Sequence, residues 1–378
     1  MATVQIYDLE PNGQIYPVGN AVLTDMNGYF NSGSILNDDG PGEDGLDIVV
    51  GIFASSPVAN VINPTNNYPY YNLTTTVWSN SASGTLDIGN LNVRYDQRGA
   101  WWIFSWPTGL TQGWYYLLST VGYNTPVVTC RWPYGSYPVY WTNGTIDLVD
   151  WACWWPDIIL HEYGHHVMCS LYGYLPPSVE NHFMNLRNDS TTAWTEGWAD
   201  FFPLAVFGKS TFVLGINATH GVVYDLEGPY WYSSGWDDGD EVEGRVAGAL
   251  LDIFDSHNDM APWYYDSFSD GFSRIWNIMH TTLCDTFLDF WHEWYANGYP
   301  KQPALMAIFQ NSIDYRGPGD ANADTHVNLF DAVIVARASG TNWTMPGFDK
   351  RADLNNDDVV NILDADIVAA NAGKTYDC

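Results

Sequence analysis

Basic residues are scarce in this chain of 378 residues. It contains 13 Lys and Arg against 44 Asp and Glu, which gives a formal net charge of -31 at pH 7. Because such a charge repels phosphate groups, we expect neither nucleic acids nor anionic membrane surfaces as partners. The same surplus of carboxylates favours the binding of divalent cations.

Long hydrophobic runs are also missing. No apolar stretch reaches the roughly 18 residues that a membrane-spanning helix needs, so we expect no membrane span. Met1 leads directly into polar, strand-like sequence without a secretory leader. Two interpretations remain open, a cytoplasmic protein or a mature secreted chain, and we favour an extracellular or cell-surface protein. Five N-x-S/T sequons fit that location: Asn72, Asn143, Asn188, Asn217 and Asn342.

Cysteine is infrequent, with five residues in the chain. In an oxidising compartment they permit two disulfides and leave one thiol over, and the spacing does not decide the pairing. We expect the terminal Cys378 to be the unpaired one. The other four are Cys130, Cys153, Cys169 and Cys284.

Aromatic residues, in contrast, are abundant, and 19 Trp and 25 Tyr contribute to an aromatic share of 16%. They fit two interpretations equally well, an aromatic-rich core or flat surfaces that face carbohydrate, peptide or a neighbouring subunit. The length and the 46% of hydrophobic residues are sufficient for two or three domains with their own cores.

Residues 156–172 contain the motif HExxH on an expected helix. His161 and His165 are four residues apart, which places both imidazoles on one side of the helix, as two metal ligands require. Glu162 lies beside them, where it can accept a proton from an attacking water but is poorly angled as a ligand. Two histidines alone hold zinc loosely, so a third protein ligand is needed. A second helix, expected to begin near residue 195, carries Glu196 and, one turn later, Asp200.

This combination resembles the gluzincin metallopeptidases, in which HExxH is followed by a glutamate ligand and then by an aspartate one turn on. The resemblance implies that His161, His165 and Glu196 bind Zn²⁺. It also implies that Glu162 is the general base and that Asp200 orients a ligand imidazole. The implied reaction is hydrolysis of peptide bonds in a protein or peptide substrate, as a zinc endopeptidase performs it.

Two further points concern this site. The metzincin pattern would require a third histidine six residues after His165, where Leu171 stands, so that family is excluded. Such a site also needs a donor for the oxyanion, and the sequence leaves five candidates open. These are Tyr230, Tyr232, Arg245, His257 and His280.

Residues 1–92 alternate short β-rich runs with turn signals, which predicts a small antiparallel β-sandwich. The phrase TDMNGYF, residues 24–30, resembles the transthyretin-like or Cna-B-like modules of secreted peptidases and surface proteins, and an unrelated sandwich is the alternative. We expect residues 93–155 to form aromatic strands that lead into the HExxH helix. Later helices are expected at 195–207, 240–255, 269–282, 285–296 and 302–313. On the second of these five, Glu243 and Arg245 either line a cleft or face solvent, and we favour solvent.

The last sixty or so residues contain an internal repeat. Oxygen-bearing residues stand at positions 1, 3, 5, 9 and 12 of a loop and recur 33 residues later, each time followed by an apolar helix start. Hard oxygen ligands in this pattern bind Ca²⁺. The first set is Asp320, Asn322, Asp324, Asn328 and Asp331, and the second is Asp353, Asn355, Asp357, Asn361 and Asp364. Because the acidic ligands repel one another without metal, we expect this module to unfold when calcium is removed.

The duplicated loop resembles a dockerin, the calcium-binding module that docks onto cohesins. Two departures are present: position six, often Gly, holds Thr325 and Asp358, and positions 10 and 11 are apolar rather than Ser or Thr. The apolar pairs are Leu329 with Phe330 and Ile362 with Leu363. We expect a cohesin-like partner, self-association, or burial of these pairs against another domain of the same chain.

These observations predict a multidomain protein with three parts: a β-sandwich at 1–92, an α/β zincin peptidase domain at 93–316 and a small α-helical calcium-binding dockerin at 317–378. The expected function is that of a secreted zinc metallopeptidase attached to a partner or surface through calcium. The alternative is an extracellular structural or assembly subunit that keeps a peptidase-like scaffold.

Overall fold

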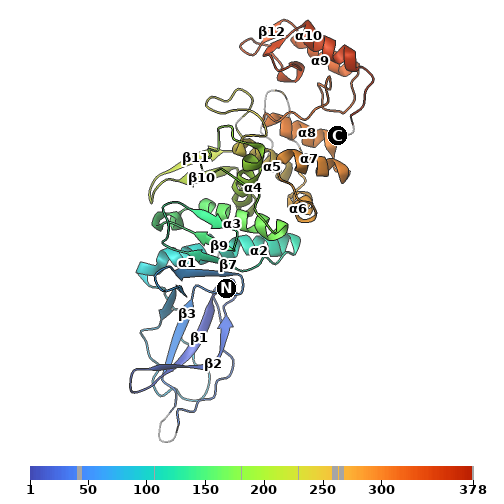
Figure 1. The fold of residues 1–378 in the computed structure, drawn as a ribbon. Coiled ribbons are helices and arrows are strands. Elements are labelled where there is room, and N and C mark those ends of the chain that lie inside the picture. Colours follow the sequence, from blue (N-terminus) through green and yellow to red (C-terminus); the bar gives the residue numbers. More distant parts are fainter. Residues whose placement is uncertain are drawn as a thin grey trace. The chain divides into compact units, whose positions relative to one another are not determined.

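The computed structural model describes residues 1–40, 45–105, 107–179, 181–228, 230–257, 263 and 268–376. The chain divides into two compact units, whose elements are drawn in Figure 1. The first unit comprises Met1–Ser170 and Val213–Val222, and the second comprises Leu171–Phe212 and Val223–Cys378. Among the described residues, no helix combines the length and the hydropathy that a membrane crossing requires.

The beginning of the chain forms a four-stranded antiparallel sheet in the order β2-β1-β3-β6. Its strands are β1 (Thr3–Leu9), β2 (Ile15–Leu23), β3 (Ile48–Phe53) and β6 (Tyr71–Leu73). Every second residue of β1 is buried, as expected of a strand with one covered face. Loop side chains such as Phe30, Ile35 and Trp78 cover that face. The described residues therefore show one sheet covered by loops, and the two facing sheets of the predicted sandwich are not found.

A second sheet has five strands in the order β5-β4-β7-β9-β8. Its strands are β4 (Ala59–Asn63), β5 (Tyr68–Pro69), β7 (Val128–Arg131), β8 (Val139–Trp141) and β9 (Thr145–Asp147). β4 pairs with β7 and β7 with β9 in parallel, whereas both edge strands are antiparallel. β4 and β5 lie within the predicted domain 1–92, but they belong to the same sheet as β7, β8 and β9, which lie beyond residue 92. The structure therefore does not divide the chain at residue 92. Ala59 and Val61 of β4 are buried, and the backbone of this apolar strand pairs with that of β7.

Two aromatic stretches that we expected as strands are helices, α1 (Arg98–Phe104) and α2 (Leu110–Val121). In α2 the buried residues Leu110, Trp114 and Leu117 recur at helical spacing, and this period outweighs the strand preference of aromatic residues. The predicted HExxH helix is confirmed as α3 (Pro156–Tyr172). Gly173 follows it with φ of 77°, as expected of the glycine that ends a helix. Two short 3-10 helices, Tyr95–Gln97 and Asp150–Trp154, precede α1 and α3.

The later helices confirm all five predicted helical stretches with shifts of a few residues. They are α4 (Ser190–Phe207), α5 (Glu243–Phe254), α6 (Phe272–Thr281), α7 (Phe287–Ala296) and α8 (Lys301–Gln310). Between α4 and α5, β10 (Thr211–Gly215) and β11 (Gly221–Asp225) form a two-stranded sheet. Several indole side chains of α4 and α7 are fully buried: Trp194, Trp198, Trp291 and Trp294. Aromatic residues thus fill the core and also stand on the surface, where Trp102, Trp141 and Trp343 are among the exposed ones, so both interpretations hold in part.

The C-terminal module repeats in structure as it does in sequence. Its helices α9 (Leu329–Ala338) and α10 (Ile362–Asn371) begin 33 residues apart, and each follows one of the loops. Two short strands, β12 (Thr341–Asn342) and β13 (Val359–Val360), pair with each other, and a 3-10 helix spans Lys350–Ala352. The module has a small core of its own, formed by Val327, Val335, Ala338, Ala352, Val360 and Val368.

The four described cysteines are free and buried. Burial raises the pKa of the Cys153 thiol and of the Cys284 thiol to about 12, and it raises the pKa of the Cys130 thiol well above its ordinary value. The predicted disulfides are therefore wrong for the described part of the chain, where these small side chains pack as core residues. Cys378, predicted to be the odd thiol, lies outside the described residues.

Candidate metal centres

The histidines of the HExxH motif converge on α3. The Nε2 atoms of His161 and His165 lie 3.1 Å apart, and their rings meet nearly at right angles. Two nitrogen ligands of a tetrahedral zinc, each bonded at 2.0–2.1 Å, lie roughly 3.3 Å apart. Glu162, between them in sequence, is buried. The pair therefore fits two corners of a zinc tetrahedron.

Glu196, the predicted third ligand, lies on α4. This helix begins where the Asp189 carboxylate accepts the backbone N–H of Thr192 at 2.9 Å, which caps the helix. Glu196 and Asp200 follow one turn apart, and both are buried. His161, His165 and Glu196 each offer one ligand atom, and these atoms all lie within 4.8 Å of one another. Two imidazoles and a carboxylate form a donor set that suits zinc, whereas the role of Asp200 stays a prediction.

His182 is a neighbour of Glu196 that the sequence did not reveal. Its Nδ1 lies 2.6 Å from Oε2 of Glu243, and its Nε2 lies 3.8 Å from Oε2 of Glu196. Burial raises the pKa of Glu243 to about 7, and the hydrogen bond with His182 opposes that shift. His182 lies in a loop and belongs to no sequence motif, so in the sequence only its being a histidine could have indicated a role at the metal site.

Glu243 and Arg245, expected on a solvent-facing side of their helix, are both buried on α5. The Arg245 guanidinium donates to the backbone oxygens of Tyr230 and Asp237 and pairs with the Asp238 carboxylate at 3.0 Å. Burial lowers the pKa of Arg245 to about 10. These contacts organise the chain segment that precedes α5, so the solvent-facing interpretation is wrong for both residues.

The remaining oxyanion candidates lie in different surroundings. The Tyr232 hydroxyl donates to the Asp358 carboxylate of the C-terminal module at 2.7 Å. His257 and His280 are exposed, and the His280 ring stacks on Trp276. A role in stabilising an oxyanion stays a prediction for each of the five candidates.

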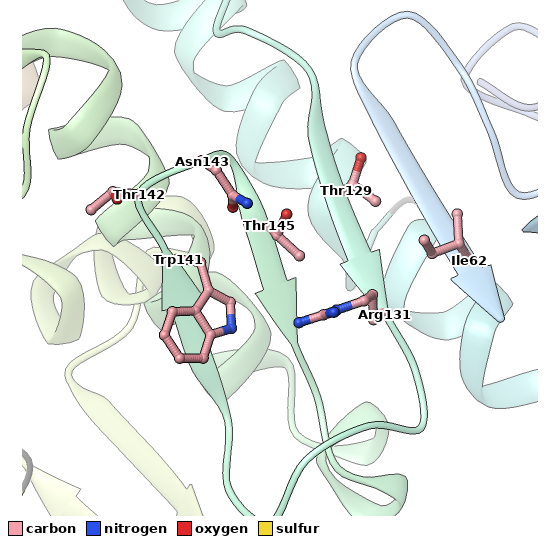
Figure 2. A pocket seen from close by; sticks show the side chains of 7 residues that line it. All are labelled: Ile62, Thr129, Arg131, Trp141, Thr142, Asn143 and Thr145. Carbon is pink, nitrogen blue, oxygen red and sulfur yellow. The ribbon is translucent and has the colours of Figure 1, made fainter. Parts of the chain in front are cut away.

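A polar hollow of about 410 Å³ lies on the five-stranded sheet (Figure 2). Arg131 of β7 donates two hydrogen bonds of 2.5 Å to the Asp147 carboxylate, which also accepts the indole N–H of Trp141 at 2.6 Å. The Arg131 and Trp141 side chains are thereby held in fixed orientations at the hollow. Its lining consists of Ile62, Thr129, Arg131, Trp141, Thr142, Asn143 and Thr145. Of these, only Asn143 was singled out in the sequence, as a glycosylation sequon.

The two loops of the C-terminal module are built alike. In the first, Asp331 accepts backbone N–H groups from Ala321 and Asn328 at 2.8 Å, and Asp320 accepts those of Asp324 and Thr325. The second loop repeats these bonds around its own first and last aspartates. The first and last carboxylates of both loops are fully buried: Asp320, Asp331, Asp353 and Asp364. Buried carboxylates gathered on a loop form the oxygen-rich surroundings that Ca²⁺ prefers.

Two details refine the predicted ligand sets. The side-chain oxygens of Asn328 and Asn361 accept the backbone N–H groups of Phe330 and Leu363, so both residues cap the helices α9 and α10. Their part in holding calcium stays a prediction. Thr325 and Asp358, at position six, have φ of 69° and 65°, the left-handed conformation for which glycine is the usual choice.

The apolar pairs after each loop are exposed and do not belong to the core of their own module. Leu329 is 74% exposed and Ile362 is 69% exposed. They border an apolar groove of about 750 Å³ between α9 and α10, whose floor includes Val335 and Val368. Burial against another domain of the same chain, one of the three expectations, stays a prediction beside an external partner and a second copy.

Together, the fold and the sites define a multidomain protein in which a helix-rich domain with an HExxH helix precedes a duplicated calcium-loop module. Residues 113–312, more than half of the chain, match the family described as the Mycolysin C-terminal domain. The chain belongs to this family, which makes it a relative of peptidases. The matched range spans residues 161–165 and Glu196.

Residues 318–371 match the Dockerin type I domain family, which confirms the predicted dockerin. Dockerins bind calcium, attach to cohesin partners and occur typically in extracellular or cell-surface assemblies. No curated protein matches the chain.

Proposed function

We propose that the protein is a zinc-dependent endopeptidase that acts on protein or peptide substrates outside the cell and is attached to a cohesin-bearing partner through its dockerin. The observation that carries this proposal is the convergence of three ligand atoms, from His161, His165 and Glu196, within 4.8 Å of one another. The buried carboxylate of Glu162 stands on the same helix as both histidines.

In this proposal His161, His165 and Glu196 would hold the zinc ion. Zinc would acidify a water molecule and polarise the carbonyl group of the scissile peptide bond. Glu162 accepts a proton from the attacking water as the new C–O bond forms. It returns this proton to the nitrogen of the leaving amine when the C–N bond breaks, so its own charge is restored after each turnover.

His182 and Glu243 support the ligand Glu196. A buried carboxylate that coordinates a metal must keep one orientation, and groups that contact it set that orientation. The Nε2 atom of His182, 3.8 Å from Glu196, lies near enough to act on it electrostatically, while the 2.6 Å bond to Glu243 fixes the imidazole. We therefore assign His182 a positioning role.

The test combines zinc content with hydrolysis of casein. The full chain should contain about one zinc ion, and Glu196→Ala should lose it, because two histidines alone hold zinc weakly. Glu162→Gln should keep the metal and lose activity by a factor on the order of 10²–10⁴, the usual contribution of a general base. Glu241→Gln, at a residue whose side chain is 43% exposed, serves as the matched control. Hydrolysis by Glu162→Gln at the wild-type rate would contradict the mechanism.

The alternative function, an assembly subunit with a peptidase-like scaffold, predicts a different result in the same experiment. The wild-type chain would then hydrolyse neither casein nor short peptides, whether or not it binds zinc. Calcium-dependent binding to a cohesin would remain, because the dockerin is independent of the catalytic residues.

A further inference from the structure

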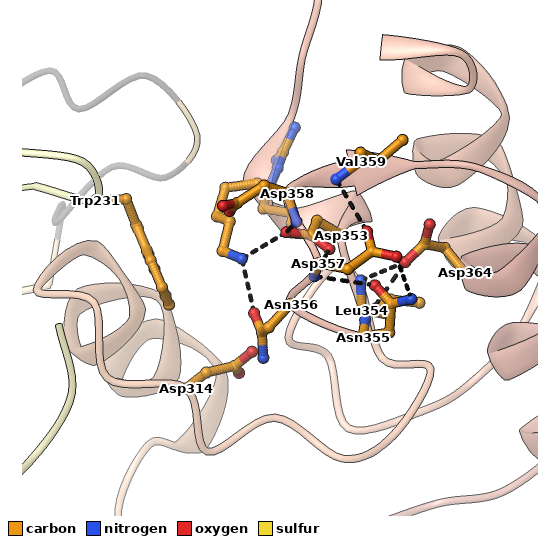
Figure 3. A network of polar contacts seen from close by, with 12 residues as sticks. Trp231, Asp314, Asp353, Leu354, Asn355, Asn356, Asp357, Asp358, Val359 and Asp364 are labelled. Carbon is orange, nitrogen blue, oxygen red and sulfur yellow. Dashed lines mark hydrogen bonds and ion pairs between the residues drawn. The ribbon is translucent and has the colours of Figure 1, made fainter. Parts of the chain in front are cut away.

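The two calcium loops differ in one buried side chain. Lys350 precedes the second loop, and its ammonium donates to Oδ2 of Asp353 and to Oδ1 of Asn356, both at 2.7 Å. It also lies 4.7 Å from the ring of Trp231, and its side chain is only 2% exposed. Figure 3 shows this network around the second loop. A protein cation thus rests on the carboxylate at the first position of the loop, one of the predicted calcium ligands.

The first loop has no lysine at the equivalent position. The residue 33 positions earlier is Gly317, which has no side chain. The neighbouring Arg316 is buried, forms a two-bond pair with Asp314 outside the loop and donates to the backbone oxygen of Ala321 inside it at 3.1 Å. In the described part of the chain, the structure shows no Lys or Arg that hydrogen-bonds to Asp320, the equivalent of Asp353. The duplication therefore supplies a matched pair of loops, one with a cation bonded to its first carboxylate and one whose nearest cation, Arg316, bonds to a backbone oxygen of the loop.

The second loop is also tied to the helix-rich domain. The Tyr232 hydroxyl donates to Asp358, and its ring stacks on Trp343 at 5.3 Å with an angle of 17° between the planes. Trp231 donates its indole N–H to the backbone oxygen of Phe309 at 2.7 Å. Tyr232 has φ of 64°, a left-handed conformation that a tyrosine adopts only where its surroundings enforce it. These contacts hold the loop independently of any ion.

We infer that at pH 7 the second loop keeps its folded form without calcium, whereas the first loop folds only when calcium binds, and that the second loop binds calcium more weakly than the first. Lys350 compensates part of the negative charge that calcium would otherwise have to neutralise. The same ammonium repels an incoming divalent ion that shares the Asp353 carboxylate. Even in water-like surroundings, a unit charge a few ångströms from a divalent ion lowers its affinity about tenfold.

Hydrogen exchange of the unmodified full chain in EGTA provides a test that needs no variant. In the second loop, the backbone N–H groups of Asp357 and Asp358 donate to Asp353. In the first, those of Asp324 and Thr325 donate to Asp320. We expect the peptide spanning the second loop to exchange at least about tenfold more slowly than the peptide spanning the first, because in the second loop the carboxylate that accepts these N–H groups is already bonded to a cation. Equal exchange in both loops would overturn the inference.

Calcium titration by calorimetry tests the role of the lysine itself. The wild-type chain should bind two calcium ions with dissociation constants about tenfold apart. Lys350→Met should bring the two constants together and remove the protection of the second loop in EGTA, and Lys350→Arg should retain both wild-type features. Lys374→Met is the control, because this lysine bonds to Asn371 and not to a loop carboxylate. Unchanged dissociation constants in Lys350→Met, or weaker calcium binding by its second loop, would overturn the inference. If that variant fails to fold in calcium, the exchange experiment on the unmodified chain decides alone.

Discussion

His182 is the residue whose importance only the structure reveals. It belongs to no motif, and its link to the metal centre depends on a loop that brings it beside Glu196 and Glu243. The residues of the motif itself could be predicted, because a spacing of four on a helix has one geometric meaning. A histidine in an irregular loop has no such signature. Chemistry carried by local periodicity is therefore predictable from the sequence, and chemistry assembled by tertiary contacts is not.

The first prediction concerns His182. His182→Ala should weaken zinc binding by about tenfold or more, the usual effect of removing a group that orients a metal ligand. Competition with a chromogenic chelator measures this affinity without reference to activity. His292→Ala, at an exposed position on α7, is the matched control and should leave the affinity unchanged. An affinity in His182→Ala equal to that of the control would show that Glu196 needs no support from His182.

The second prediction concerns pH and the first calcium loop. Burial, with the charges of the other loop aspartates, raises the pKa of Asp320 to about 6 from its ordinary value of 3.8. Without calcium the folded loop therefore binds a proton more tightly than the unfolded chain, and the loop gains stability as the pH falls from above 6 toward 3.8. In EGTA, Asp320→Asn should be more stable than the wild type at pH 7, and this difference should shrink as the pH approaches 5.

Thermal unfolding of both chains at several pH values measures that difference. Asp366→Asn, at an exposed position on α10, controls for the loss of one charge. In calcium the order should reverse, because Asp320→Asn removes a ligand of the ion. A stability difference in EGTA that is independent of pH would contradict the assignment of the raised pKa to Asp320.

At the scale of elements, close packing of α4 against α5 sets the position of Glu196. A Cβ atom at Gly197 would lie 2.8 Å from the Glu243 carbonyl oxygen and 2.8 Å from Cβ of Val246. Gly197→Ala should therefore push the two helices apart and destabilise the protein by roughly 1–3 kcal/mol, the usual cost of overpacking. Because the shift separates Glu196 from His182 and Glu243, zinc affinity should fall as well.

Chemical denaturation and chelator competition measure the two effects of Gly197→Ala. Gly228→Ala is the matched control, because a Cβ atom there meets no other atom closer than 3.9 Å. If the Gly197→Ala chain is as stable as this control, α5 can move away from α4 without a loss of folding free energy, and the prediction is wrong.

Helices with a clear apolar period were predictable, and α3 to α8 follow the expected stretches closely. The stretches of α1 and α2 were misinterpreted because tryptophan and tyrosine favour strands in isolation, whereas the period of Leu110, Trp114 and Leu117 is helical. The pairing of β4 with β7 was beyond prediction for another reason. Partners about 70 residues apart leave no local trace in the sequence, since strand pairing is decided by the tertiary fold.

At the scale of the whole molecule, the exposed apolar pairs that follow the two dockerin loops predict how the protein attaches to its partner. Replacing Phe330 and Leu363 together by Ser should abolish calcium-dependent binding to a cohesin. Burial of each side chain contributes roughly 1.5–3 kcal/mol, so the loss should exceed about 100-fold in affinity. Zinc content should not change, because both residues belong to the C-terminal module.

Surface binding assays with calcium and with EGTA measure this attachment, and size-exclusion chromatography with light scattering detects self-association instead. Leu288→Ser, at a residue of α7 that is 39% exposed, is the matched control outside the dockerin. Full cohesin binding by the Phe330 and Leu363 double variant would mean that the partner uses a different face.

The shortage of lysine and arginine affects the resistance of the protein to proteolysis. Proteases of the trypsin type cut only after these two residues, and three of the 13, Arg245, Arg316 and Lys350, have side chains no more than 2% exposed. Peptide bonds in ordered, buried segments are cleaved only when the segment opens. The folded chain therefore offers such enzymes few targets, and its vulnerability shifts to proteases that cut after aromatic residues, at exposed side chains such as Tyr29 and Tyr95.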